Sequence, residues 1–171
     1  SLVVGDPMDM KTDVGPLVNK DGLTQIEMQV HDAVSKGAMI LAGGKRLERK
    51  GYFYKPTVLS NIKNNMKVVT EEVFGPVAPI IIVNDEEEAI KVANNSEFGL
   101  GASIWTKDEN KGLEIAKQIE AGDVFINSVV KSDPRMPFGG IKKSGIGREL
   151  SKYGLKEFVN IKGINVYEVK R

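Results

Sequence analysis

A continuous run of β-branched and other apolar residues, VAPIIIV, spans residues 77–83. Such a run is typical of a strand that is buried on both faces of a parallel sheet. Downstream, the pattern predicts a helix starting at Asp85, a strand over 101–105, a helix capped by Asp108 and a strand over 124–126. Strands that alternate with short helices build βαβ units. The sequence therefore predicts an α/β fold with a mostly parallel sheet flanked by helices.

The regions before and after this alternation carry further local signals. Residues 5–22 are rich in Gly, Pro and Asp, which indicates a looping entry segment. The capping-box pattern TQIE at 24–27 predicts the start of a helix, and Gly37 predicts its end. The apolar stripe of this helix comprises Ile26, Val30, Ala33 and Val34. We also expect strands over 38–41 and 53–59, a helix over about 147–158 and a terminal strand over 161–169.

Composition limits the possible functions. The chain has 171 residues, 24 Lys and Arg against 23 Asp and Glu, one histidine and no cysteine. Without cysteine, these residues hold no disulfide, no Cys-based zinc site and no thiol nucleophile. His31 alone cannot supply a pair of histidine metal ligands. The near-neutral charge argues against a nucleic-acid-binding protein, and no apolar run approaches the ~20 residues of a membrane span. We therefore expect a cytoplasmic protein with no metal, nucleic-acid or membrane partner.

Two glycine-rich segments are better explained as turns than as nucleotide-binding loops. Gly43-Gly44-Lys45 lacks the earlier glycine and the following Ser or Thr that a phosphate-binding loop requires. Gly145 and Gly147 form a G-x-G pattern without a third glycine and outside a first βα unit. Neither segment is predicted to bind a phosphate.

Two other segments allow both a structural and a functional interpretation. The adjacent carboxylates of residues 71 and 72 precede a strand predicted to be buried, where they need hydrogen bonds, solvent or a ligand. The PFGG segment at 137–140 follows the strand over 124–126, at the edge where α/β sheets place ligands. Its glycines permit close backbone approach, and its phenylalanine could form the wall of a pocket.

Four segments together resemble the aldehyde dehydrogenase superfamily. Residues 71–76, EEVFGP, look like the family motif E-E-x-F-G-P, and residues 137–149 look like P-F-G-G-x-K-x-S-G-x-G-R-E. Residues 93–100, ANNSEFGL, and the glycines and prolines of residues 5–17 also fit. The similarity spans essentially the whole chain, in order.

The resemblance implies the three-layer fold of the family's catalytic domain, with a mostly parallel sheet and a C-terminal oligomerisation strand. Residues 1–158 would form the C-terminal portion of that domain, and residues 159–171 would form the strand that joins a neighbouring subunit's sheet. The family's cysteine nucleophile, general-base glutamate, oxyanion asparagine and cofactor domain have no match here and would lie upstream of Ser1. We therefore expect no catalytic residue in this chain and no activity from the chain alone.

The resemblance also assigns four binding residues. Glu72 resembles the glutamate that accepts hydrogen bonds from the nicotinamide-ribose hydroxyls of NAD or NADP, and Phe74 resembles its partner beside the nicotinamide. Phe138 resembles the aromatic wall of the substrate tunnel. Ser132, five residues before the proline of the PFGG motif, resembles the serine that binds the distal carboxylate in succinate-semialdehyde dehydrogenases.

The activity implied is the NAD(P)-dependent oxidation of succinate semialdehyde to succinate by the intact enzyme, as a homodimer or homotetramer. The choice between NAD and NADP is not determined by these residues. Two alternatives remain open. Ser132 can be an ordinary loop serine in an aldehyde dehydrogenase of another substrate class, or the chain can be a non-catalytic oligomerisation or binding module.

Overall fold

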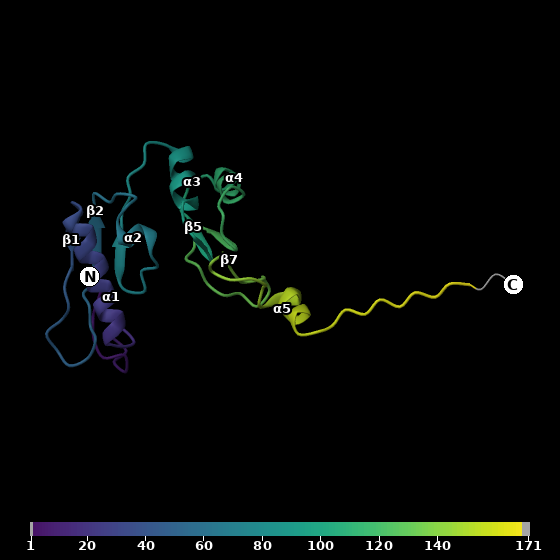
Figure 1. Ribbon diagram of the computed structural model, residues 1–171, viewed down its shortest axis with the longest axis horizontal. Coiled ribbons are helices and arrows are strands. Elements are labelled where there is room, and N and C mark those ends of the chain that lie inside the picture. The colour runs from purple at the N-terminus through teal and green to yellow at the C-terminus, as the bar shows by residue number, and fades with distance from the viewer. Residues whose placement is uncertain (1, 169–171) are drawn as a thin grey trace. The chain divides into compact units, whose positions relative to one another are not determined.

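The computed structural model describes residues 2–168 and divides the chain into two compact units, Ser1–Asn84 and Asp85–Arg171 (Figure 1). Each unit has its own helices and its own short strands. Glu72 and Phe74 belong to the first unit, and Ser132 and Phe138 belong to the second. Among residues 2–168, no helix combines the length and the apolar character needed to cross a bilayer.

The first unit is built on a three-stranded sheet in the order β1-β2-β3. Its strands are β1 (Met39–Ala42), β2 (Thr57–Ser60) and β3 (Val77–Pro79). β1 pairs with β2 in the antiparallel sense, and β2 pairs with β3 in the parallel sense with Thr57 opposite Val77. Two helices, α1 (Lys20–Ser35) and α2 (Lys67–Thr70), complete the unit.

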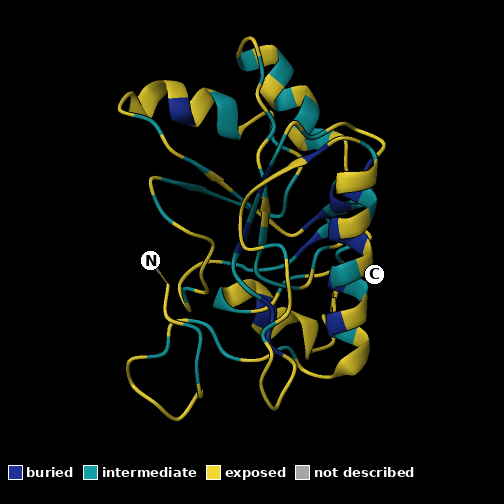
Figure 2. Cartoon of the chain, turned by 90° about the vertical axis from the view of Figure 1, so that its left-hand side faces the viewer, coloured by how far each residue is buried: buried dark blue, intermediate teal, exposed yellow. Residues whose placement is uncertain are grey.

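The core of the first unit lies between α1, α2 and the middle strand. Dark blue bands recur along α1, the longest helix, in Figure 2. Ile26 and Ala33 of this helix and Leu59 of β2 are 1%, 0% and 0% exposed. Their neighbours in the same cluster are Leu23, Val30, Ala38, Tyr54, Met66 and Val68. The stripe predicted from the sequence is confirmed at Ile26, Val30 and Ala33, whereas Val34 is exposed.

The start of α1 differs from the prediction. The helix begins at Lys20, and the side chain of Asn19 accepts a hydrogen bond from the N–H of Gly22 at 2.8 Å. The capping box expected at Thr24 is wrong, because this residue lies inside the helix. An asparagine at the N-cap satisfies a free N–H of the first turn as well as a threonine does.

The second unit contains two pairs of strands. β5 (Gly101–Ile104) and β6 (Asp123–Ile126) are parallel, with Gly101 opposite Asp123. β4 (Phe98–Gly99) and β7 (Ile141–Lys142) are antiparallel. The helices are α3 (Glu86–Asn94), α4 (Glu109–Ala116) and α5 (Ser151–Glu157). Asp85 and Asp108 cap α3 and α4 through the N–H groups of Glu88 and Lys111, which confirms both predicted starts.

The α/β class is confirmed, but the sheets are small and mixed rather than mostly parallel. β3 ends at Pro79, although residues 77–83 were expected to form one buried strand. Ile80 still donates its N–H to the carbonyl oxygen of Leu59, but it is 45% exposed and Ile82 is 87% exposed. A run of β-branched residues forms a strand only where a partner strand accepts its hydrogen bonds, and past Ile80 the described residues provide none.

The predicted terminal strand is not formed within the residues that the structure describes. Residues 161–168 have no strand assignment, and position 169 lies outside the described residues. An isolated strand has no partner for its backbone N–H and C=O groups and is not stable alone. The helix expected over about 147–158 is present in shorter form as α5.

Candidate functional site

The carboxylate of Glu71 is tied to both helices of the first unit. Its Oε2 accepts hydrogen bonds from the side-chain amides of Gln25 at 3.0 Å and Gln29 at 3.2 Å. Its Oε1 lies 3.2 Å from Nζ of Lys67 on α2. The hydrogen bond from Gln29, together with the ion pair to Lys67, holds the pKa of Glu71 below its ordinary value. Glu71 is therefore an anchor between α1 and α2, and its negative charge is already compensated.

Gln29 binds the segment at a second point. Its Nε2 also donates to the backbone carbonyl oxygen of Glu72 at 3.0 Å. Gln29 is 0% exposed, and its Oε1 has no hydrogen-bond partner among the described residues. Both amide protons of this buried side chain are thus directed at residues 71 and 72.

The residues that follow Glu71 alternate between the interior and the surface. Glu71 has extended backbone angles, φ −116° and ψ 158°, and extended backbone sends successive side chains to opposite sides. Val73 packs against the core, whereas Glu72 is exposed and Phe74 is 78% exposed. The structure thus places Glu72 and Phe74 on the exposed side of one anchored segment.

Close packing of Gly75 against α1 holds the far end of this segment. A β-carbon at Gly75 would lie 2.7 Å from Cδ1 of Ile26, so any larger residue here would force the Ile26 side chain or the backbone to shift. The carboxylate of Glu72 makes no hydrogen bond or ion pair with the part of the chain that the structure describes. An exposed carboxylate without a partner can accept two hydroxyl donors, which is what a ribose offers.

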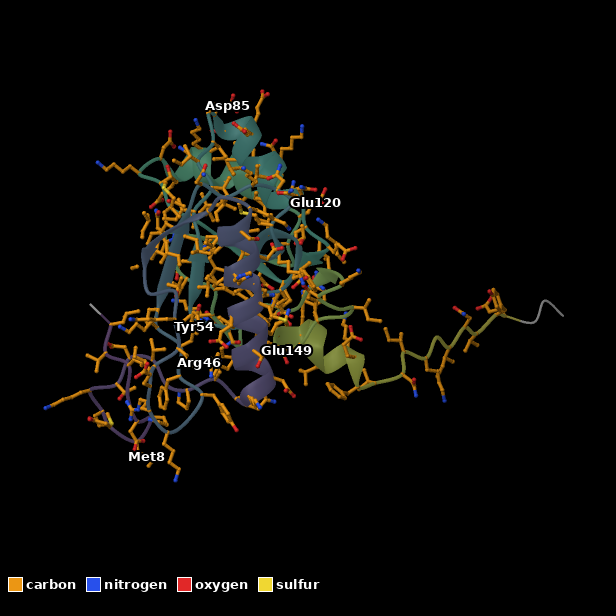
Figure 3. All side chains as sticks on the ribbon, turned by 60° about the vertical axis from the view of Figure 1, so that its left-hand side comes forward. Met8, Arg46, Tyr54, Asp85, Glu120 and Glu149 are labelled. Carbon is orange, nitrogen blue, oxygen red and sulfur yellow. The ribbon has the colours of Figure 1, made fainter. Side chains whose placement is uncertain are left out.

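In the second unit, the PFGG loop is fixed by backbone contacts. Phe138 and Glu149 exchange two backbone hydrogen bonds of 2.9 and 2.8 Å, and Glu149, labelled in Figure 3, lies shortly before α5. The N–H of Gly139 donates to the carboxylate of Asp123 at 3.1 Å. A groove beside the loop is lined in part by Leu100, Phe138, Ser144, Ile146 and Phe158. These hydrogen bonds therefore hold the loop in place, and Phe138 forms part of the wall of the groove.

Ser132 lies in an exposed loop before that motif, and its hydroxyl makes no hydrogen bond with the described residues. Arg135 forms a bidentate ion pair with Asp133. Its Nε donates to Oδ1 at 2.9 Å, and its Nη2 donates to Oδ2 at 2.6 Å. The guanidinium holds the pKa of Asp133 well below its usual range. Arg135 is therefore neutralised locally, whereas the hydroxyl of Ser132 is free within the described residues.

The Gly43-Gly44 segment forms a turn that is bound to β2. Gly43 and Gly44 have φ values of +74° and +76°, and the N–H of Gly44 donates to the hydroxyl of Thr57 at 2.8 Å. These values are typical of a tight turn that only glycine adopts easily.

His31 is exposed on α1, and residues 2–168 contain no group of three or more His, Cys, Asp or Glu side chains able to hold a metal.

Gln29 and the anchoring role of Glu71 were not predicted from the sequence. One signal was available, since Gln29 lies three residues after Ile26 and one before Val30, on the helix face that is otherwise apolar. A polar residue at a core position of an amphipathic helix must have a buried partner, and the partner here is the EEVFGP segment.

Comparison with known proteins finds relatives over nearly the whole chain. The model described as "Aldehyde dehydrogenase family" matches residues 1–164. The NADP(+) succinate-semialdehyde dehydrogenase 1 of Mycobacterium bovis is 50% identical over 164 residues, which are 96% of this chain and 36% of that protein. An aldehyde dehydrogenase of Paenarthrobacter nicotinovorans is 48% identical over 162 residues, 95% of this chain and 35% of that protein. The chain thus spans about a third of the length of these curated relatives.

Solved structures agree with the sequence matches. The aldehyde dehydrogenase of Mycobacterium tuberculosis complexed with NAD+ matches with a TM-score of 0.88 and 42% identity, over 92% of this chain and 33% of that one. The betaine aldehyde dehydrogenase of Staphylococcus aureus in complex with NAD+ matches with a TM-score of 0.87 and 39% identity, over 92% of this chain and 32% of that one. Since the family model covers residues 1–164, including both motif segments whose anchoring is described above, the chain belongs to the aldehyde dehydrogenase family.

Proposed function

We propose that this chain is the C-terminal portion of the catalytic domain of an NAD(P)-dependent aldehyde dehydrogenase that oxidises succinate semialdehyde to succinate. Residues 1–158 form that portion, and residues 159–171 form an oligomerisation strand. The observation that carries the proposal is the outward orientation of Glu72 and Phe74 on a segment that Gln29 and Glu71 anchor. The identity of 50% to a succinate-semialdehyde dehydrogenase supports the substrate class.

Glu72 and Phe74 would hold the nicotinamide half of the dinucleotide. The free carboxylate of Glu72 would accept hydrogen bonds from the two ribose hydroxyls, and Phe74 would pack beside the nicotinamide. When bound, the dinucleotide supplies the hydride acceptor for the oxidation. The relatives include an NADP(+) enzyme and an NAD+ complex, so the binding of both NAD+ and NADP+ should be measured.

Dinucleotide titration of the complete protein that contains this chain tests this role. Glu72→Gln should weaken binding about tenfold, because charge-assisted hydrogen bonds to a hydroxyl are roughly twice as strong as neutral ones. Glu48→Gln is the matched control, since Glu48 is also an exposed carboxylate of the first unit. Equal affinities for the wild-type protein and Glu72→Gln would contradict the role of Glu72.

Ser132 and Phe138 would contact the aldehyde. The hydroxyl of Ser132 is free to donate to the distal carboxylate of succinate semialdehyde, and Phe138 would form one wall of the substrate tunnel. Arg135 is not assigned to this carboxylate, because Asp133 already occupies its guanidinium.

Substrate choice can be tested with two aldehydes of similar length. In the complete protein, Ser132→Ala should raise the Michaelis constant for succinate semialdehyde more than that for an uncharged aldehyde, by about fivefold for one lost hydrogen bond. Equal effects on the two aldehydes would instead favour an aldehyde dehydrogenase of another substrate class.

We also propose that the chain alone is inactive, because the family reaction uses a cysteine nucleophile and these residues contain none. Purified chain mixed with aldehyde and NAD(P)+ should give no reduced dinucleotide. Turnover by the cysteine-free chain would overturn this part of the proposal.

The terminal segment would join a neighbouring subunit's sheet in a homodimer or homotetramer. Its apolar side chains are largely exposed in this chain, with Ile161, Ile164 and Val166 at 86%, 80% and 91%. Addition of such a segment to a sheet edge would cover them. Light scattering should show that Val166→Asp dissociates the oligomer, whereas Asn165→Asp, which adds the same charge at a polar position, should not. An unchanged mass for Val166→Asp would count against this interface and favour a different one.

A further inference from the structure

We propose that Gln29 is a positioning residue for the dinucleotide site, which sets the direction of the Glu72 carboxylate without touching the ligand. The inference rests on the proposed role of Glu72. It concerns a different element, because Gln29 lies on α1 and is separated by 43 residues from the segment it holds.

Gln29 is fully buried. The side chain is 0% exposed on the apolar face of α1, where Ile26 and Val30 are 1% and 4% exposed. A polar side chain at such a place is unfavourable unless its hydrogen-bonding groups are satisfied. Its Oε1 atom has no hydrogen-bond partner among the described residues. If this position served packing alone, an apolar residue would therefore be more favourable than glutamine.

The two amide protons of Gln29 bind two successive residues of the EEVFGP segment. One reaches Oε2 of Glu71 at 3.2 Å, and the other reaches the backbone oxygen of Glu72 at 3.0 Å. The two bonds fix a side chain on one residue and the backbone of the next. Together they restrict the backbone torsion angles between Glu71 and Glu72. A bond to either residue alone would not do so.

The hydrogen bonds of Gln29 also determine where the side chain of Glu72 points. With the Glu71 side chain held inward and the backbone extended, the next side chain must point outward. A neutral amide suits this task, because it donates to both groups without burying a charge at position 29. Gln29 thus uses its donors on one side of the segment and leaves the Glu72 carboxylate free on the other.

The experiment compares two glutamines of α1 in the complete protein. Gln29→Met keeps the length and volume of the side chain but removes both hydrogen bonds. Gln25→Met removes one bond to Glu71 and leaves the backbone of Glu72 held. We expect Gln29→Met to weaken dinucleotide binding about three- to tenfold, and Gln25→Met to have a smaller effect. The Michaelis constant for the aldehyde should change in neither variant.

A double-mutant cycle with Glu72→Gln separates positioning from a general structural role. If Gln29 acts through Glu72, Gln29→Met should weaken binding little further once Glu72 is already Gln. Equal weakening in both backgrounds, or no weakening while Glu72→Gln alone reduces affinity, would overturn the inference. If Glu72→Gln itself has no effect, the proposed role of Glu72 fails, and the role of Gln29 fails with it.

A second variant keeps the test decisive if Gln29→Met does not fold, as judged from its thermal midpoint. Gln29→Asn retains the amide but shortens the side chain by one methylene, which withdraws its donors from Glu72. The same cycle with Glu72→Gln then applies, with the same expected loss of dinucleotide affinity and the same contradicting results.

Discussion

Gly122 lies so close to Gly139 that a β-carbon on Gly122 would stand 1.6 Å from the carbonyl oxygen of Gly139. The next residue, Asp123, accepts a hydrogen bond from the N–H of Gly139 at 3.1 Å. The turn before β6 and the loop that carries Phe138 are therefore packed backbone against backbone. This contact adds to the two Phe138–Glu149 backbone hydrogen bonds that hold the PFGG segment in place.

Gly122→Ala should therefore destabilise the second unit. The methyl group would meet backbone atoms that cannot rotate away, so the loop or the turn must shift, at a cost of about 1–3 kcal/mol of unfolding free energy. Urea denaturation, followed by hydrogen exchange resolved to residues 85–168, measures the effect. Gly163→Ala is the matched control, because nothing lies within 4 Å of a β-carbon built at Gly163. Equal stabilities of the two variants would show that the contact with Gly139 is not as tight as described.

Leu59 and Leu41 make a second pair of test positions, on adjacent strands of the first unit. Leu59 is 0% exposed in β2, whereas Leu41 is 61% exposed in β1. Leu59→Ala should lower the free energy of unfolding by about 2–5 kcal/mol, because it leaves a cavity in the core. Leu41→Ala should change it by less than about 0.5 kcal/mol. A comparable loss at Leu41 in the isolated chain would indicate that β1 is covered in solution.

The cap of α4 depends on one side chain. Asp108 accepts a hydrogen bond from the N–H of Lys111 at 3.0 Å at the start of a helix of eight residues. Asp108→Ala should lower the stability of the second unit by about 1 kcal/mol and speed hydrogen exchange at the Lys111 amide. Asp108→Ser retains an acceptor and should restore most of the loss. Failure of serine to do so would assign the effect to the charge near the helix dipole rather than to the hydrogen bond.

Because Glu71 is anchored as a carboxylate, the free energy of unfolding should depend on pH. Its pKa is lowered in the folded chain, so the unfolded chain takes up a proton first as the pH falls. The contribution of Glu71 is complete above its ordinary pKa of 4.5 and is lost as the pH falls through the lowered value. Because the group is partly exposed and screened, the loss should be less than about 1 kcal/mol.

Urea denaturation of the wild-type chain and of Glu71→Gln, across a pH series from about 6 down to 3, measures this dependence. The difference in unfolding free energy between the two proteins should shrink as the pH falls. A difference that stays constant would show that the carboxylate at position 71 titrates alike in the folded and unfolded chain.

Features that depend on neighbouring residues in sequence were predicted well. The starts of α3 and α4 follow from Asp85 and Asp108, because a capping side chain bonds an N–H only three residues away. The start of α1 was misplaced, because Asn19 and the TQIE pattern at 24–27 are both competent signals and only the packing of Leu23 into the core favours the earlier one.

Strand pairing was predicted less well. Residues 77–83 have one continuous β-branched pattern, but only the part that lies beside β2 forms a strand. The two-residue strands β4 and β7 had no signal, because Phe98 and Lys142 meet from 44 positions apart. Propensity describes how one residue fits a pleated surface, and the surface itself is assembled from distant segments.

The sequence by itself determined the family, the α/β class, the helix caps and the absence of a cysteine nucleophile, because these depend on residue identity and short-range spacing. The tertiary structure alone decided which of two adjacent carboxylates is anchored and which is free. Glu71 and Glu72 are identical in chemistry, and they differ only because a buried amide 42 positions earlier in the chain binds the first side chain and the backbone of the second.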